Sequence, residues 1–187
     1  MKIIIKFKWN IYLMKGPKIY VVTGGSCSGK TTLLSELSKR GYRTFPESAR
    51  VLIDRGIAEG KTLEEIRKDE IDFQKKVLKM KLELEDKLKE DEVVFLDRGV
   101  PDTIAYYKLY NFDFSDLLTI CKKKRYEKIF FLEPLIFEKD YARIEDKETT
   151  RKLSDLIKRV YLDLGYEVIT VPVMSVEQRA KFVLSKL

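Results

Sequence analysis

The sequence contains no histidine and only two cysteines, and both shortages exclude whole classes of chemistry. Without histidine there is no Ser-His-Asp or Cys-His catalysis, no histidine proton shuttle and no His-ligated metal. Cys27 and Cys121 stand far apart in the chain, so they form neither a zinc site nor a disulfide framework. A metal that takes part is therefore expected to be a hard cation on oxygen ligands, with Mg²⁺ as the first choice.

Long apolar runs are also missing. No segment approaches the ~18 apolar residues that a membrane-spanning helix needs. Lysines interrupt the apolar stretch 2–9, and no small-residue cleavage site follows it, so it is a poor signal peptide. We therefore expect a cytoplasmic protein without a transmembrane segment. Asparagine and glutamine are scarce beside lysine and glutamate, a composition that resembles that of thermophile proteins.

The composition is otherwise that of a globular protein with an excess of positive charge. The chain has 187 residues, 44% of them hydrophobic, which suits one domain with a substantial core. Its 37 Lys and Arg residues against 30 Asp and Glu residues give a net charge of +7. Such a charge can support binding to nucleic acid or to anionic lipid. Most of the lysines alternate with glutamates on expected helices, so nucleic acid is not the expected partner, while peripheral lipid contact stays open.

Residues 1–17 stand apart from the rest of the chain as an N-terminal extension. Apolar residues alternate with polar ones over residues 1–13, the pattern of an edge strand that Gly16-Pro17 would turn back. The alternative is a mis-assigned start, because Met14 begins a well-formed sequence just before the first core strand. We favour this alternative and expect the function to survive deletion of the extension.

From Lys18 onward, short apolar runs alternate with segments of helical periodicity. This alternation predicts an α/β domain over residues 18–187, with a parallel sheet covered by helices on both faces. The expected strands cover 19–22, 42–45, 92–97, 128–132 and 167–171. A capping box at Thr62–Glu65 is expected to open a long helix with an apolar stripe from Phe73 to Leu88. A later helix is expected to start at Thr150.

The segment Gly24–Thr31 matches G-x-x-x-x-G-K-[ST] and lies between an expected strand and an expected helix. Its glycines let backbone N–H groups approach phosphate oxygens, and the helix N-terminus adds positive potential. Lys30 is expected to reach the β- and γ-phosphates, and Thr31 to bind Mg²⁺. Cys27 is expected to be a small residue whose N–H binds phosphate, with a redox switch as the alternative. The expected nucleotide-binding residues are Gly24, Gly25, Ser26, Cys27, Ser28, Gly29, Lys30, Thr31 and Thr32.

A second hydrophobic strand ends in Asp97, the expected additional magnesium-binding carboxylate. The next residue is Arg98, where motor ATPases usually carry a glutamate that activates water. The chain also lacks the D-x-x-G and N-K-x-D sequences of Ras-like GTPases. Asp97-Arg98 looks like the acid–arginine pair of nucleoside and nucleotide kinases, in which the arginine helps to hold phosphate or acceptor.

Further candidates for an acceptor site follow from the order of the strands. Glu47 ends the second strand, and the carboxyl ends of parallel strands form the ligand crevice. It could orient or deprotonate a hydroxyl or bind Mg²⁺ through water, and capping the next helix is an equal alternative. Arg50 could grip an anionic acceptor or be a solvated helix residue. Gln74 could hydrogen-bond the acceptor, whereas Asp102 has a strong alternative role as a first-turn carboxylate that stabilises its helix.

The segment after the fourth strand is where kinases of this type carry a lid of arginines. Arg143 and Arg151 are the candidates here, expected to converge on the transferring phosphoryl group. Arg151 would lie in the first turn of a helix, where the helix dipole disfavours a cation unless an anion is bound nearby. The alternative for both is a surface ion pair with Glu145 or Glu148.

Four segments together resemble a known family: G-G-S-C-S-G-K-T-T, P-E-S-A-R (46–50), D-R-G-V-P-D (97–102) and G-Y-E-V-I-T-V-P (165–172). The chain from residue 18 to 187 is similar to the AAA-domain-like P-loop family that includes the ribosylnicotinamide-kinase domain of NadR and the TRPL translocation-defect protein. The resemblance implies a five-stranded parallel sheet in the order 2-3-1-4-5. It also implies binding of ATP or GTP with Mg²⁺ at Lys30, Thr31 and Asp97.

Two functions remain open at this point. The first is a Mg²⁺-ATP-dependent phosphotransferase on a small hydroxyl-bearing acceptor, such as a nucleoside or a vitamin-like compound. In it Lys30, Arg143 and Arg151 would neutralise charge, and Glu47 would position the acceptor. The second is a regulatory module that turns ATP or GTP over slowly and signals to a protein or anionic lipid. Arg98 and the arginine lid favour the first, since a passive nucleotide sensor needs neither. The sequence does not indicate the oligomeric state.

Overall fold

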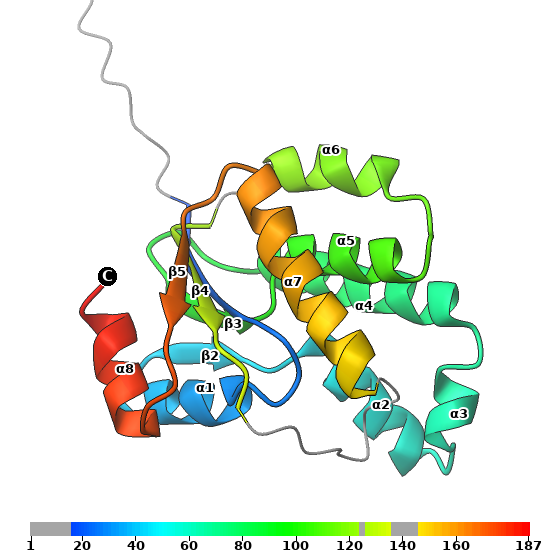
Figure 1. Cartoon of the computed structure of the whole chain (residues 1–187), viewed down its shortest axis with the longest axis horizontal. Coiled ribbons are helices and arrows are strands. Elements are labelled where there is room, and N and C mark those ends of the chain that lie inside the picture. Colours follow the sequence, from blue (N-terminus) through cyan, green and yellow to red (C-terminus); the bar gives the residue numbers. More distant parts are fainter. Residues whose placement is uncertain (1–15, 124–125, 136–145) are drawn as a thin grey trace, which may run out of the picture.

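The computed structural model describes residues 16–123, 126–135 and 146–187. The expected edge strand within residues 1–13 lies outside this part of the chain. Five parallel strands form one sheet in the order β2-β3-β1-β4-β5, which confirms the predicted fold and strand order (Figure 1). The strands are β1 (Lys18–Thr23), β2 (Arg43–Phe45), β3 (Val93–Asp97), β4 (Lys128–Leu132) and β5 (Val168–Val171).

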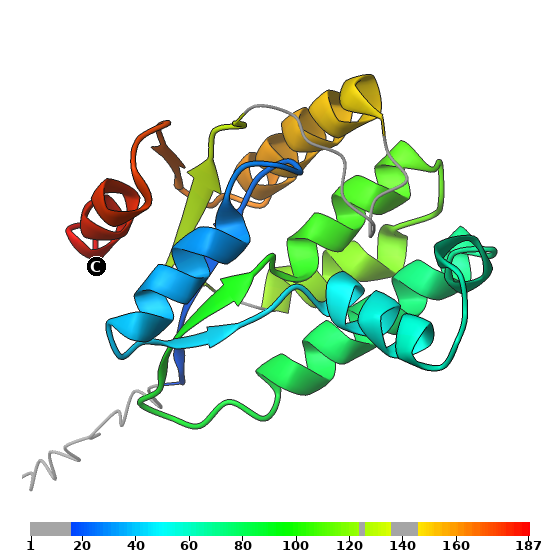
Figure 2. The ribbon, with the colours of Figure 1, turned by 90° about the horizontal axis from the view of Figure 1, so that it is seen from below.

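Helices cover both faces of this sheet and complete three layers, as Figure 2 shows. They are α1 (Lys30–Lys39), α2 (Ser48–Ala58), α3 (Leu63–Ile66), α4 (Glu70–Glu85), α5 (Val100–Leu109), α6 (Ser115–Lys123), α7 (Lys147–Asp163) and α8 (Val176–Leu184). In β1, Tyr20 and Val22 pack toward α1 and α8, while Ile19 and Val21 pack toward α5, α6 and α7. Alternate residues of one buried strand therefore pack into two hydrophobic cores, one on each face of the sheet.

A third, smaller core joins α2 to α4 and supports one end of the molecule. Ile53 packs there with Phe73 and Val77, the buried beginning of the predicted apolar stripe. The expectation that the Thr62 capping box opens the long helix is wrong, because that box starts only the four-residue α3. The side chain of Asp69 accepts a hydrogen bond from the backbone N–H of Asp72 and starts α4 separately.

Helix α7 also begins earlier than expected. The side chain of Asp146 accepts from the backbone N–H of Thr149 at 2.8 Å, so the helix starts at Lys147 and not at Thr150. Arg151 therefore lies in the second helical turn. No bound anion is needed to offset the helix dipole at this position, because the dipole acts mainly within the first turn.

The carboxyl ends of β1, β2 and β3 meet at one edge of the sheet. The phosphate loop follows β1 there, Glu47 follows β2, and Asp97 ends β3. Parallel topology thus brings together three segments that are far apart in sequence. No helix within the described residues has both the length and the apolar character needed to cross a membrane.

Candidate active site

The phosphate loop connects β1 to α1 and is fitted closely to the strand beside it. Gly24 has φ 136°, and a Cβ atom there would lie 2.6 Å from the backbone oxygen of Leu132. Only glycine suits this position, for reasons of both space and backbone conformation. Cys27 also has a positive φ, 56°, and its carbonyl accepts a 3.0 Å hydrogen bond from the backbone N–H of Leu135. These contacts hold the loop against the end of β4 and the residues that follow it.

Lys30 holds its ammonium group inside the loop. Its Nζ donates to the carbonyls of Gly25 at 2.8 Å and Gly24 at 3.3 Å, and to Ser28 Oγ at 3.4 Å. The side chain comes from the first residue of α1, where the helix N-terminus also attracts negative charge. The predicted loop thus gathers a cation and a helix N-terminus around one concave backbone segment, an arrangement that fits the phosphates of a nucleotide.

Arg179, which the sequence patterns did not single out, braces the same loop from α8. Its Nη1 donates to the carbonyl of Ser28 at 2.6 Å, and its Nε donates to the carbonyl of Pro172 at 3.1 Å. The side chain is buried, although in sequence it looks like an ordinary surface arginine of an amphipathic helix. It ties the apex of the phosphate loop to the connection between β5 and α8.

Asp97 is buried at the end of β3, and its Oδ1 finds no hydrogen-bond partner among the residues described. Burial raises the pKa of Asp97 to about 6; the charge of Lys30 opposes this rise, while that of Glu47 adds to it. Asp97 and Thr31 line one cavity of about 320 Å³ together with Glu47 and Arg50. A carboxylate and a hydroxyl beside a phosphate site are oxygen donors that suit Mg²⁺, which usually binds one or two carboxylates plus substrate phosphates.

Glu47 and Arg98 form a largely buried ion pair next to this cavity. Arg98 Nε lies 2.8 Å from Glu47 Oε1, with the two side chains 3% and 18% exposed. Glu47 occupies the N-cap position of α2, but its side chain makes no capping hydrogen bond. The capping alternative is therefore not seen, and the role of Glu47 at an acceptor site stays a prediction. The backbone of Arg98 is left-handed, with φ 66°, and this strained turn directs the guanidinium back toward α2.

Asp102 completes the pairing of Arg98 from the opposite side. Its Oδ1 accepts from Arg98 Nη1 at 3.1 Å and from Thr23 Oγ1 at 2.5 Å. Its Oδ2 accepts from the backbone N–H of Gly99 at 3.0 Å and from the Tyr161 hydroxyl at 2.6 Å. The expected role of this carboxylate in capping its helix is therefore present, and a second role in holding Arg98 is added. Thr23 and Tyr161 come from distant elements, and no local motif marks them.

The charge state of Glu47 limits what it can do. Burial raises the pKa of Glu47, but the positive charges of Arg98 and Lys30 and the hydrogen bond from Arg98 outweigh burial and lower it to about 2. The carboxylate is thus ionised throughout the neutral range and is a weak base. It is suited to accept a hydrogen bond from a hydroxyl group and so to orient it.

A narrow cavity lies between the phosphate loop, α2, α4 and α5, and it brings together most of the acceptor candidates. Glu47, Arg50, Gln74 and Arg98 all line it, whereas Asp102 lies behind Arg98. The full lining consists of Ser26, Glu47, Ala49, Arg50, Ile53, Arg67, Phe73, Gln74, Val77, Lys81, Arg98 and Tyr106. Buried Lys81 is a further cation of this wall, and its Nζ donates to the carbonyl of Gly99 at 2.9 Å.

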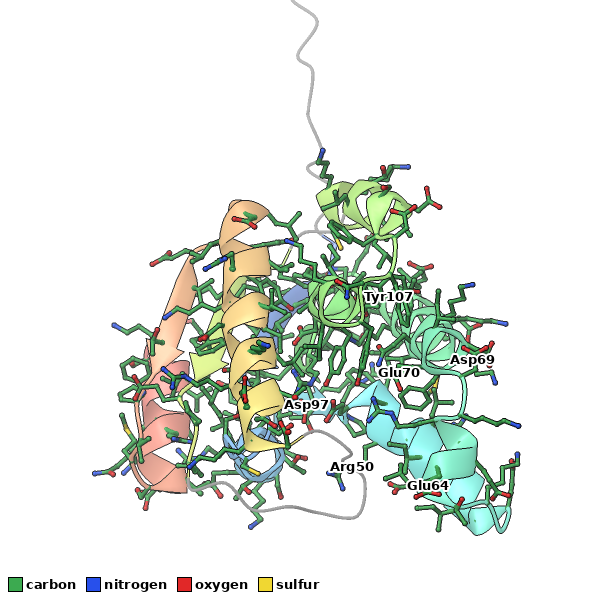
Figure 3. The ribbon with its side chains drawn as sticks, turned by 45° about the vertical axis from the view of Figure 1, so that its right-hand side comes forward. Arg50, Glu64, Asp69, Glu70, Asp97 and Tyr107 are labelled. Carbon is green, nitrogen blue, oxygen red and sulfur yellow. The ribbon has the colours of Figure 1, made fainter. Side chains whose placement is uncertain are left out.

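The two candidate lid arginines have different outcomes. Arg143 lies outside the described residues. Arg151 is exposed on α7 and lines a separate cavity with Gly25 and Ser26 of the phosphate loop. Among the described residues Arg151 forms no ion pair with Glu148, whose Oε1 lies 4.0 Å from Lys152 Nζ. The other alternative partner, Glu145, lies outside the described residues. In Figure 3, Asp97 and Arg50 lie at the same end of the molecule as the start of α7.

Comparison with known proteins identifies the family. A family model described as "AAA domain" matches residues 19–179. The chain belongs to this AAA-domain family. Among curated proteins, none matches the sequence significantly.

Solved structures with the same fold are P-loop kinases at low identity. NadR in complex with NR superposes with a TM-score of 0.67 at 18% identity, covering 90% of this chain and 49% of that one. This AAA-domain protein therefore spans about half the length of the NadR chain. A deoxyadenosine kinase from M. mycoides gives 0.63 at 16% identity, covering 90% and 97% of the two chains. Shikimate kinase from Acinetobacter baumannii in complex with shikimate gives 0.60 at 19%, covering 92% and 93%.

The buried carboxylate of Asp97 should reduce stability, and Asp97→Asn tests this. A folded-state pKa above the ordinary 3.8 means that the folded protein binds a proton more tightly than the unfolded chain does, so stability falls as pH rises through about 4 to 6. Asp97→Asn should therefore raise the free energy of unfolding at pH 8 by up to about 3 kcal/mol, and by less at pH 5. Urea denaturation at both pH values measures this.

The exposed Asp91→Asn, just before β3, is the matched control and should change stability by less than about 0.5 kcal/mol. A loss of stability in Asp97→Asn at pH 8 would contradict the proposed cost of the buried charge.

Lys30→Ala should remove nucleotide binding while leaving the fold intact, because it deletes the cation that the loop encloses. We expect ATP affinity to fall by about 100-fold or more, since hydrogen bonds to charged groups are the strong ones. Calorimetric titration gives the affinity, and circular dichroism checks the fold. Lys39→Ala, in the exposed last turn of the same helix, should bind ATP normally. Unchanged ATP affinity in Lys30→Ala would refute the phosphate-loop assignment.

Proposed function

We propose that this AAA-domain protein is a Mg²⁺-ATP-dependent phosphotransferase that acts on a small hydroxyl-bearing acceptor, such as a nucleoside or a vitamin-like compound. The observation that carries the proposal is the cavity beside the phosphate loop, with the Glu47–Arg98 ion pair in its wall. A protein that only binds and slowly hydrolyses nucleotide has no need of a second cavity with an oriented carboxylate at this place.

The residues take roles that follow from their positions. Lys30 donates to the β- and γ-phosphates, and Thr31 and Asp97 hold Mg²⁺, which when bound neutralises phosphate charge. Glu47 accepts a hydrogen bond from the acceptor hydroxyl and turns its oxygen toward the phosphoryl group. Arg98, held by Asp102, keeps that carboxylate in place and ionised. Positioning and electrostatics supply most of the rate in such a reaction.

Arg50 and Arg151 complete the charge pattern around the reacting groups. Arg50 lines both the cavity with Asp97 and the cavity with Gln74, so it stands between the expected metal site and the expected acceptor site. We assign it contact with the acceptor. Arg151 faces the phosphate loop from α7 and, together with Arg143, would neutralise the transferring phosphoryl group.

The related structures support this proposal through their chemistry. They include a deoxyadenosine kinase, a shikimate kinase and thymidylate kinases, and the NadR structure holds NR. The names of these proteins point to different acceptors. The shared fold therefore favours phosphoryl transfer to a small molecule, while the residues that line the cavity would select the acceptor.

The proposal is tested by ADP release from Mg²⁺-ATP, alone and with pools of nucleosides, vitamins and sugars. Asp97→Asn is the blank. We expect one pool to stimulate ADP release and to yield a product heavier by a phosphoryl group. Slow turnover that no pool changes would overturn the proposal in favour of the regulatory module. Co-sedimentation with anionic liposomes at two salt concentrations would then test for a lipid partner.

Glu47→Gln should lower the acceptor-dependent kcat by about 100-fold, because a misplaced acceptor hydroxyl costs about that much. The KM for ATP should hardly change, since Glu47 does not contact the phosphates. The wild-type kcat should show no acidic limb from Glu47 above pH 5, because its pKa is about 2. Glu59→Gln, exposed just after α2, is the control. An unchanged kcat in Glu47→Gln would remove the carboxylate from the mechanism.

A further inference from the structure

Arg179 of α8 is a buried cation without an ion-pair partner in the described part of the chain. It is 2% exposed, and the charge of Glu133 acts on it only from beyond ion-pair distance. Its Nη2 atom is buried and finds no hydrogen-bond acceptor among the described residues. A buried guanidinium is costly unless it is paired, and proteins retain such groups where a ligand uses the charge. The place of Arg179 behind the phosphate loop points to the phosphates of a nucleotide.

The hydrogen bond from Arg179 fixes one peptide group of the phosphate loop. Its Nη1 donates to the Ser28 carbonyl at 2.6 Å from the α8 side, whereas Lys30 Nζ donates to the Gly25 carbonyl inside the loop. The described peptides are all trans, so the C=O and N–H groups of each point in opposite directions. The N–H of Gly29 therefore points away from Arg179 and into the loop. No described residue accepts a hydrogen bond from it, so it is available to a phosphate oxygen.

Without this contact the Ser28–Gly29 peptide would rotate easily. Gly29 has φ 80°, and glycine tolerates both signs of φ, so the backbone itself gives the peptide plane little preference. The preceding peptide is held differently, because the backbone N–H of Leu135 donates to the Cys27 carbonyl. A Cβ atom at Gly29 would lie 3.1 Å from Arg179 Nη1, so the guanidinium packs closely against this peptide. The orientation of the Ser28–Gly29 peptide thus depends on one side chain.

The guanidinium of Arg179 is itself held firmly. Its Nε donates to the carbonyl of Pro172, just after β5, at 3.1 Å. Helix α8 lies beside α1 (Figure 1), and Ala180 and Val183 pack with Leu33 in the core between the two helices. A side chain that projects from a well-packed helix and bridges two carbonyls is suited to positioning another group.

We propose that Arg179 is a positioning residue for the phosphates of the nucleotide. It holds the Ser28–Gly29 peptide with its N–H turned into the loop, and it places a positive charge behind that peptide. This role rests on the proposed function of the loop as an ATP site. The ligand group that it serves is the polyphosphate chain, whichever base or acceptor accompanies it.

Calorimetric binding of Mg²⁺-ATP and of inorganic triphosphate with Mg²⁺ to the full chain tests this role without turnover. Arg179→Met removes the charge and the donors, so it should weaken both ligands about tenfold, the effect of one hydrogen bond. Arg179→Lys keeps the charge but cannot bridge both carbonyls, and it should weaken both about threefold. Lys181→Met, which removes an exposed cation of α8 paired with Glu177, is the matched control and should bind both ligands normally. Wild-type affinity in Arg179→Met would overturn the proposal.

An NMR signal from the peptide itself separates positioning from a general loss of structure. Ser28-Gly29 is the only Ser-Gly pair in the sequence, so ¹³C-serine and ¹⁵N-glycine labelling by cell-free synthesis reports this peptide alone. Saturating Mg²⁺-ATP should shift the Gly29 N–H resonance of the wild type downfield, because a hydrogen bond to phosphate forms. The shift should be smaller in Arg179→Met and unchanged in Lys181→Met. An equal shift in Arg179→Met despite weaker binding would overturn the positioning role and leave only an effect of charge.

Phosphoryl transfer is measured separately, so that the two proposals can fail independently. A wild type that binds Mg²⁺-ATP but phosphorylates no acceptor would overturn the proposed function and leave the role of Arg179 in place. If circular dichroism shows that Arg179→Met does not fold, Arg179→Lys decides the question. Wild-type affinity together with a wild-type Gly29 shift in that variant would overturn the role of Arg179 and leave the phosphotransferase in place.

Discussion

The buried Arg98 guanidinium is the interaction on which the arrangement of the site depends. A buried cation is costly unless it is paired and hydrogen-bonded. Here Glu47 pairs with it from the start of α2, and Asp102 from the first turn of α5. Asp102 is itself held by Thr23 of β1 and Tyr161 of α7. Arg98 thus connects the ends of three neighbouring strands with helices on the α5 side of the sheet. It also sets the position of Glu47, whose carboxylate lines both the cavity with Asp97 and the cavity with Gln74.

The burial of so many charged side chains reduces the stability of the fold, and their position beside the phosphate loop indicates a function. Lys30, Lys81 and Arg98 are buried close to Glu47, Asp97 and Asp102, so three cations balance three carboxylates. The pairing is uneven, because Glu47 has a lowered pKa while Asp97 has a raised one. A carboxylate left without a hydrogen-bond partner at one oxygen reduces stability, and proteins retain such groups where a ligand uses them.

The sequence predicted the parts of the fold and site that depend on local spacing. The alternation of strands and helices, the phosphate loop and Asp97-Arg98 are recognisable because glycines, apolar runs and a lysine stand at fixed intervals. The strand order followed only from the resemblance to a known family. The starts of two helices were misplaced: α4 begins later than predicted, after its cap Asp69, and α7 begins earlier than predicted, after its cap Asp146. Thr23, Tyr161 and Arg179 were missed, since their roles arise only when distant elements pack together.

The fate of the γ-phosphoryl group of ATP tests the central claim most directly. The protein is incubated with Mg²⁺ and ATP labelled in that group, in the presence of the acceptor pool that binds best, and the label is followed by mass spectrometry. The account predicts that most of the label appears in a phosphate ester of the acceptor, and that Glu47→Gln slows formation of this ester by about 100-fold while ATP still binds. Label found only in inorganic phosphate, with every acceptor pool, would contradict it.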